Sequence, residues 1–350
     1  MNAPSLVAVG TTKDSSPPAG MRQDLPAAVQ RAVLILTRHV TPATRGEGAV
    51  VTAARAEYAP PWDAPLVDRP VVQHIIERLA GEGVRQLDVL ADPAIDDIDA
   101  LRRFVSDNDR WGMHVRWLTG ERPDDCEPLR RLGGEERLAL VFADSLMLHS
   151  FADPMLHEGV VARLTCDAAT PWAVIDGDVL ELLPAACDLH GLGQWLADLE
   201  EIEVRAAVGL PAATSRQLLE SQRRLLTRST TPMGELDNAA GPHLIGRELQ
   251  SGVRFCRNVR IHPSAQVDAP VFIGDNTRIG KGVHLGSNTV IGANCLIDHH
   301  ARLENALVME GTYIGPWVEM YDSLVQCNTV TNVRIGARVE IDDPLICGRL

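Results

Sequence analysis

The sequence predicts two structural units in one chain: an α/β domain followed by a parallel β-helix. In the first two thirds, short apolar segments alternate with amphipathic segments of helical spacing, which is typical of a largely parallel sheet covered by helices. Closer to the C-terminus, an aliphatic residue recurs at every sixth position, the period of a coil made of short, flat faces. A chain of 350 residues is long enough for both units to form their own cores.

The six-residue period is the strongest pattern in the sequence. Eight successive positions at this spacing are aliphatic: Ile261, Val267, Ile273, Ile279, Leu285, Ile291, Ile297 and Leu303. If roughly a third of residues are comparably apolar, chance agreement is on the order of one in several thousand. Four of these residues are followed by glycine: Gly274, Gly280, Gly286 and Gly292. We therefore expect the aliphatic residues to stack inside the coils, and glycine and asparagine to form the corners.

The period is interrupted after Leu303. It resumes at Val308, Ile314 and Met320, and again at Ile335 and Ile341. This interruption predicts either an extruded loop or a shifted coil, in a stack of about four to five coils that runs almost to the C-terminus.

The α/β domain is predicted from seven segments. Strands are expected at Ala32–Leu36, Gln86–Leu90, Met113–Leu118 and Leu138–Phe142, and helices at Val71–Ala80, Ile98–Val105 and Ser215–Leu226. Pro70 fits the first turn of its helix, and Gly81 and Gly83 are suited to ending it. Residues 170–212 give no clear pattern, so the role of residues 150–240 stays open.

Composition sets the boundaries and the expected environment. Residues 1–28 contain Ser-Ser-Pro-Pro and few large apolar groups, so we expect a disordered tail, then an α/β domain over 29–235 and a β-helix over 242–350, with a linker near Pro232–Gly241. A net charge of −14 argues against nucleic acid or an anionic membrane as a partner. The sequence has neither an apolar run of membrane-spanning length nor a C-x-x-C pair, which favours a cytoplasmic protein without membrane insertion or a zinc site.

Three segments of the first domain carry a resemblance to a known family. Pro65–Leu79, Asp107–Val115 and Phe142–Leu146 resemble the sugar-phosphate nucleotidyltransferases (NDP-sugar pyrophosphorylases). The resemblance implies a Rossmann-like nucleotidyltransferase domain and a left-handed parallel β-helix of hexapeptide repeats. It also implies a nucleotide or sugar phosphate as ligand, Mg²⁺ as the cofactor of an active enzyme, and a role in nucleotide-sugar or surface-polysaccharide metabolism.

The phosphate-binding parts of that family are poorly matched. The family's glycine-rich loop follows the first strand, but Thr37–Gly46 has no glycine before Gly46, and Val40, Thr41 and Pro42 oppose its backbone geometry. The family's lysine is absent from Pro60–Ala64, and its base-binding turn is replaced by Pro123–Pro128.

Three residues of this domain remain as candidates for the nucleotide site. Arg38 and Arg45 are candidate phosphate contacts, with Thr44-Arg45 resembling a displaced Thr-Arg pair; ordinary surface arginines are the alternative. Asp144 is the candidate Mg²⁺ ligand at a strand end, with a helix cap or loop carboxylate as the alternative.

Three functions follow from these observations. The first is a nucleotidyltransferase-like protein with a degenerate, weak or inactive site, and the second is an active NDP-sugar pyrophosphorylase. The third is a hexapeptide-repeat acyltransferase with His299 or His300 as general base, although the β-helix can also serve only as a structural platform. A homo-oligomer formed through the β-helix is expected in each case, because open coil ends need to be covered.

Overall fold

The computed structural model describes residues 29–37, 58–120, 125–134, 136–148, 161–165, 170–199, 203–206, 208–228 and 242–350. The predicted tail over 1–28 and the predicted linker over 232–241 lie outside the described residues, as do Arg38 and Arg45.

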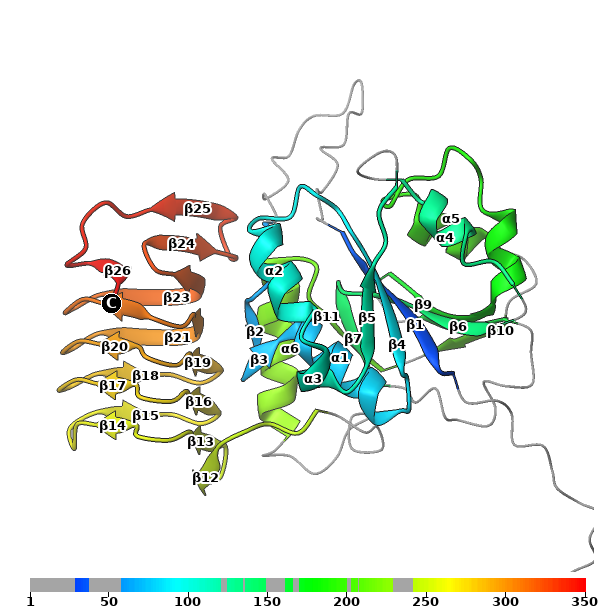
Figure 1. Cartoon of the computed structure of the whole chain (residues 1–350). Helices are drawn as coiled ribbons and strands as arrows, with labels where there is room; N and C mark the ends of the chain where they lie inside the picture. The colour runs from blue at the N-terminus through cyan, green and yellow to red at the C-terminus, as the bar shows by residue number, and fades with distance from the viewer. Residues whose placement is uncertain are drawn as a thin grey trace, which may run out of the picture.

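The first unit is built on one mixed sheet of seven strands in the order β10-β8-β9-β6-β1-β4-β5 (Figure 1). β9 alone runs against the other strands, since it pairs antiparallel with β6 and β8 while the remaining neighbours are parallel. The strands are β1 (Arg31–Leu36), β4 (Gln86–Ala91), β5 (His114–Trp117), β6 (Arg137–Phe142), β8 (Val161–Thr165), β9 (Trp172–Asp176) and β10 (Glu203–Ala206). The four predicted strands are therefore present, within one or two residues at each end.

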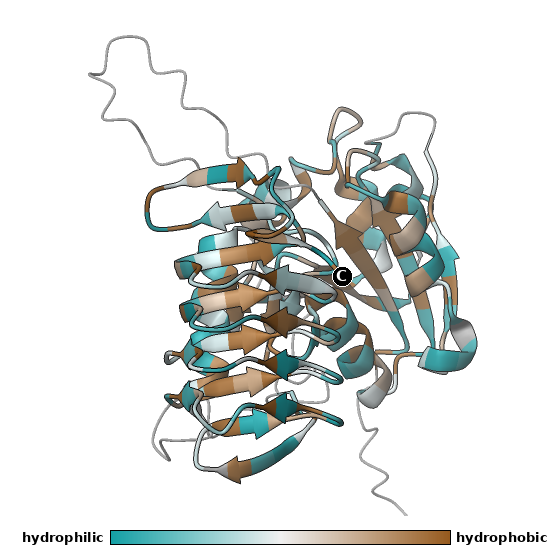
Figure 2. Cartoon of the chain, turned by 90° about the vertical axis from the view of Figure 1, so that its left-hand side faces the viewer, coloured by the Kyte–Doolittle hydropathy of each residue, from teal (hydrophilic) through white to brown (hydrophobic). Residues whose placement is uncertain are grey.

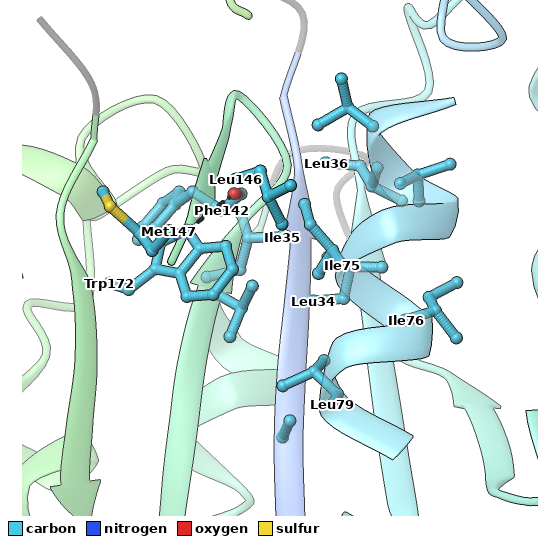
Figure 3. Close-up of a cluster of buried hydrophobic side chains, with 14 of the residues drawn as sticks. Leu34, Ile35, Leu36, Ile75, Ile76, Leu79, Phe142, Leu146, Met147 and Trp172 are labelled. Carbon is cyan, nitrogen blue, oxygen red and sulfur yellow. Dashed lines mark hydrogen bonds between the residues drawn. The ribbon is translucent and has the colours of Figure 1, made fainter. Parts of the chain in front are cut away.

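The core of this unit explains why β1 is apolar along its whole length. Strand β1 lies between β4 and β6 in the middle of the sheet, and the side chains on both of its faces are buried. Figure 3 shows Leu34 and Ile35 of β1 between Ile75 of helix α1 and the indole of Trp172, and all four side chains are fully buried. The helical spacing of Val71–Ala80 thus places one face of α1 on the sheet.

The three predicted helices are present, each within two residues at either end, as α1, α2 and α6, and the structure adds four short helices. Together these are α1 (Val71–Gly81), α2 (Ile98–Val105), α3 (Asn108–Trp111), α4 (Glu127–Arg130), α5 (Leu192–Asp198), α6 (Ser215–Arg228) and the 3₁₀ helix η2 (Gly177–Leu182). Two small antiparallel pairs complete the unit: β2 (Pro65–Leu66) with β3 (Arg69–Pro70), and β7 (Ser145–Met147) with β11 (Gly209–Pro211). Helices α1 and α6 lie on the side of the sheet that faces the C-terminal unit (Figure 1).

The C-terminal unit is a β-helix-like stack of short strands. Its strands are β12 (Arg247–Gln250), β13 (Val253–Phe255), β14 (Arg260–Ile261), β15 (Gln266–Val267), β16 (Val271–Ile273), β17 (Arg278–Ile279), β18 (His284–Leu285), β19 (Thr289–Ile291), β20 (Leu296–Ile297), β21 (Arg302–Val308), β22 (Thr312–Ile314) and β23 (Glu319–Gln326). Successive coils pair in parallel, as in Ile261 with Ile279 and Val267 with Leu285. Hydrophobic bands therefore recur from coil to coil (Figure 2).

The predicted inward residues are buried wherever a coil covers them on both sides. Ile273, Leu285, Ile291 and Ile297 have no exposed surface. Ile261 and Val267 are only half-buried, as expected for the first coil of the stack. The six-residue period therefore identifies the interior of this unit correctly.

The interruption after Leu303 is a shortened coil face rather than an extruded loop. Leu303 pairs with Met320, and Ile291 with Val308, so the pairing offset falls from eighteen residues to seventeen. Asn305 takes the left-handed corner conformation at φ 48°, and its amide donates to Asp322 Oδ1 of the next coil at 2.7 Å. The corner at Asn305 thus accommodates the loss of one residue, and the strands of neighbouring coils stay paired.

The repeats end at β23, so the prediction that they continue through Ile335 is wrong. The chain turns back after Cys327 and forms an antiparallel hairpin of β24 (Thr329–Asn332) and β25 (Ala337–Glu340) against β23. Ile335 lies in the hairpin turn and is 63% exposed. Ile341 does pack against the coil interior, but from outside the parallel strands. The last strand, β26 (Cys347–Arg349), pairs antiparallel with β22.

A ladder of asparagines stabilises another corner of the coils. Asn258, Asn276 and Asn294 all adopt left-handed φ angles between 55° and 58°, which asparagine tolerates better than most residues. The amide of Asn258 donates to Asn276 at 3.0 Å, and that of Asn276 to Asn294 at 3.1 Å. Glu310 accepts from Asn294 at 2.9 Å and ends the ladder.

One outward face of the stack is apolar and joins the two units. In β16, β19, β21 and β23, some residues point away from the coil interior, because side chains alternate along a strand. On this face they are Phe272, Val290, Leu307 and Leu324, and all four are buried in the core cluster of the α/β unit. Helix α6 packs against β21 and β23. The stack is therefore docked on the sheet domain.

The turn between β2 and β3 contacts the start of the stack through hydrogen bonds. Asp68 Oδ2 accepts a hydrogen bond from the Ile245 amide at 2.8 Å and lies 3.2 Å from the Arg69 guanidinium. Its other oxygen is 3.2 Å from His74 Nε2, and Arg69 also donates to the carbonyl of His243. Burial alone would raise the pKa of Asp68, but the hydrogen bond and charge of His74, the Ile245 amide and Arg69 together hold it below its ordinary value.

In the described ranges, none of the helices combines the length and the apolarity needed to cross a bilayer.

Candidate functional site

A cavity of about 310 Å³ opens at the carboxyl ends of the central strands. Parallel strands that end side by side leave a crevice at this edge of a sheet, and ligands of α/β proteins bind there. Leu36 ends β1 and Thr37 follows it, Asp96 comes from the loop after β4, and Asp144 comes from the turn after β6.

Other segments close the sides of the cavity. These are Tyr58–Trp62 with Ala64, the first turn of α1, and the turn before α6 that contains Ala212 and Ala213. Tyr58 is held in place because its carbonyl accepts from the Ser215 amide at 2.7 Å, at the start of α6. These sides of the cavity are therefore anchored to two helices.

Asp144 lies in the cavity wall, as the sequence predicts, but its carboxylate is already engaged. One oxygen, Oδ2, accepts from the Thr170 amide at 3.1 Å and from the Thr170 hydroxyl. The backbone carbonyl of Asp144 accepts from the Ala212 amide at 2.7 Å. These contacts orient the side chain from within the protein, which is the arrangement of a loop carboxylate.

A magnesium ion is the cofactor that the family resemblance implies for an active enzyme. Mg²⁺ in proteins is usually held by one or two carboxylates together with substrate phosphates and water. The described residues bring together no group of three His, Cys, Asp or Glu side chains suited to a metal ion. Thr170 holds one oxygen of Asp144, and Mg²⁺ at this position stays a prediction.

Among the described residues, the cavity lining carries more acidic than basic side chains. Asp96 and Asp144 line it, and Arg338 is the one basic residue that the described chain contributes to its lining. Close by, desolvation and the charges of Asp97 and Glu310 raise the pKa of Asp63. The segment in which the family carries its lysine thus has a carboxyl group in acidic surroundings.

Sequence reasoning missed Asp96 among the charged lining residues, and it also missed Arg338. Arg338 lies on β25, in the hairpin that follows the coils, more than a hundred residues from any other lining residue. Its neighbours in the sequence give no sign of a role at the sheet domain. Only the three-dimensional structure reveals this residue, because the packing of the stack on α6 places the hairpin at the cavity.

The two histidines proposed for acyl transfer lie at a corner of the coils. His299 Nδ1 is 2.8 Å from Asp298 Oδ1, and the Tyr313 hydroxyl donates to Asp298 Oδ2 at 3.0 Å. The hydrogen bond from His299 contributes most to lowering the pKa of Asp298. His300 instead stacks on the exposed ring of Trp317, with centroids 4.3 Å apart. The Asp298–His299 pair has the orientation that a general base needs, but its role in acyl transfer stays a prediction.

Comparisons with known proteins agree with the resemblance of the sequence. Residues 267–349 match the family described as the GMPPB C-terminal domain. The UTP–glucose-1-phosphate uridylyltransferase of Synechocystis sp. is 35% identical over 105 residues, which is 29% of this chain and 27% of that protein. The chain thus matches about a quarter of the length of this relative. Both similarities point to the sugar-phosphate nucleotidyltransferases.

Proposed function

We propose that this chain is a nucleotidyltransferase-like protein of nucleotide-sugar metabolism, with a degenerate site that binds a sugar phosphate or nucleotide and transfers nucleotidyl groups weakly or not at all. The proposal assigns residues 29–235 to a Rossmann-like nucleotidyltransferase domain and residues 242–350 to a left-handed β-helix of hexapeptide repeats. It includes a homo-oligomer formed through that β-helix and a role in surface-polysaccharide synthesis.

The charge of the cavity carries this proposal. In nucleotidyl transfer, a sugar 1-phosphate attacks the α-phosphate of a nucleoside triphosphate and pyrophosphate leaves, so negative charge must be stabilised throughout. Of the residues that the structure describes, Asp96 and Asp144 contribute carboxylates to the lining and Arg338 alone contributes a guanidinium. Such a balance favours a ligand with one phosphate over a triphosphate.

A pyrophosphate-release assay tests the proposal. Purified protein is incubated with Mg²⁺, each nucleoside triphosphate and several sugar 1-phosphates, beside an active pyrophosphorylase as positive control. We expect release from every pair to be at background or far below that of the positive control. Release comparable to the positive control that is lost in Asp144→Asn but kept in Asp178→Asn, an exposed carboxylate on η2, would establish the active NDP-sugar pyrophosphorylase instead.

The acyltransferase alternative rests on the Asp298–His299 pair. It predicts binding of coenzyme A and loss of acyl transfer in His299→Ala. Calorimetry that detects no heat of binding with coenzyme A or acetyl-coenzyme A would remove this alternative.

A further inference from the structure

The hairpin β24–β25 is fixed to both units of the chain. Within the C-terminal unit, the side-chain amide of Asn332 donates to the Tyr321 carbonyl at 2.8 Å and to Ser323 Oγ at 3.2 Å. Towards the α/β unit, the Arg216 guanidinium of α6 donates to the carbonyl of Val333. Val333 also packs against the core cluster of that unit. The hairpin therefore has a defined position at the cavity.

Arg338 is the residue that this position brings to the cavity. On β25 it pairs with Thr331 of β24, which keeps its backbone in the hairpin ladder. Its side chain is exposed and lines the cavity. Among the described residues, no carboxylate lies within ion-pair distance of Arg338, whereas Arg254 and Arg257 in the same unit have acidic partners. A guanidinium without a carboxylate partner at a ligand cavity is available for an anion.

We propose that Arg338 binds the phosphate group of a sugar phosphate in this cavity, so that the C-terminal hairpin forms part of the ligand site. This inference rests on the proposed function and adds a binding residue to the same site. A guanidinium can bind two phosphate oxygens with parallel hydrogen bonds. The first turn of α1 also borders the cavity, and its N-cap, Pro70, offers no side-chain cap, so the helix end favours negative charge nearby.

The other polar groups of the cavity fit the sugar. The hydroxyl groups of a sugar donate hydrogen bonds, and the exposed carboxylate of Asp96 can accept them. A volume of about 310 Å³ lies at the lower end of the range for ligand pockets, which suits a monosaccharide phosphate better than a whole nucleotide sugar. A sugar phosphate thus matches both the size and the two kinds of charge in the cavity.

Calorimetry with glucose 1-phosphate tests the inference, using the full chain. Glucose, inorganic phosphate, UTP and UDP-glucose serve as comparison probes. Arg338→Ala removes the guanidinium, and Arg334→Ala is the matched control, because Arg334 is exposed on the same hairpin but does not line the cavity. We expect glucose 1-phosphate to bind and glucose to bind much more weakly. The Kd should rise about tenfold or more in Arg338→Ala and stay unchanged in Arg334→Ala.

A second readout locates the ligand. Hydrogen exchange of the wild-type protein should slow at Ala337–Glu340 when glucose 1-phosphate is added, and this slowing should be lost in Arg338→Ala. Equal affinity of Arg338→Ala and wild type would overturn the inference and leave the proposed function standing. An equal loss in both arginine variants would also overturn it, since it would show only a general effect of charge. Failure of glucose 1-phosphate, UTP and UDP-glucose to bind the wild type would overturn the proposed function itself.

Discussion

Replacing Asp68 with asparagine should weaken the contact between the β2–β3 turn and the start of the C-terminal unit. The substitution keeps an oxygen that can accept from the Ile245 amide but removes the negative charge facing Arg69 and His74. The carboxylate has no exposed side-chain surface, so water does not replace these contacts. Removing one partner of a buried ion pair costs about 3–5 kcal/mol. Because Arg69 is partly exposed and keeps its second partner, Glu77, we expect a loss of about 2 kcal/mol in the free energy of unfolding.

The assay is urea denaturation followed by circular dichroism, across a range of pH. The folded protein holds the pKa of Asp68 below the ordinary 3.8, so its contribution is fully present above that value and is lost as the pH falls through the lowered pKa. Wild type and Asp68→Asn should therefore differ at neutral pH and converge as the pH falls below about 4. Glu220→Gln, in an exposed pair with Arg223, is the control and should change stability by less than about 1 kcal/mol. Equal stability of wild type and Asp68→Asn at neutral pH would refute this reasoning.

Two further substitutions test the C-terminal unit. A Cβ atom on Gly274 would lie 2.6 Å from the backbone nitrogen of Ala293, so Gly274→Ala should destabilise the coils by about 1–3 kcal/mol in thermal or urea unfolding. Gly81→Ala, where a Cβ meets nothing within 4 Å, should be tolerated, and equal effects of the two would contradict the close approach of the coils. Leu307→Ala should cost about 2–5 kcal/mol, because Leu307 is fully buried between the units. Leu296 occupies the equivalent outward position on another face and is only half-buried, so Leu296→Ala should cost clearly less; the reverse order would place the interface elsewhere.

The parts of the fold that follow a local rule were predictable from the sequence. The six-residue period marked Ile273, Leu285 and Ile297 as interior residues, and all three are fully buried. The helical spacing of Val71–Ala80 and the apolar run at Ala32–Leu36 gave a helix and a central strand in contact. In each case, the pattern of burial repeats within a few residues, so a short stretch of chain carries the information.

The parts that depend on contacts between distant segments were not predictable. The strand β9 is antiparallel to β6, and nothing in its short apolar run gives its direction. The outward residues Phe272, Val290 and Leu307 were not singled out, because a coil pattern defines only the interior. The candidate site divides in the same way: Asp144 was found as a strand-end carboxylate, whereas Arg338 reaches the cavity only through the docking of the two units.

The antiparallel hairpin after β23 also has a consequence for the length of the stack. A stack of parallel strands can in principle grow without limit, since each coil offers the next one a complete row of backbone donors and acceptors. Here β24 and β25 occupy that row, and they run the wrong way for another parallel coil to follow. The turn of the hairpin is also tied to the neighbouring unit through Val333. A further parallel coil therefore cannot follow at this end, and growth of the stack by added coils is blocked here.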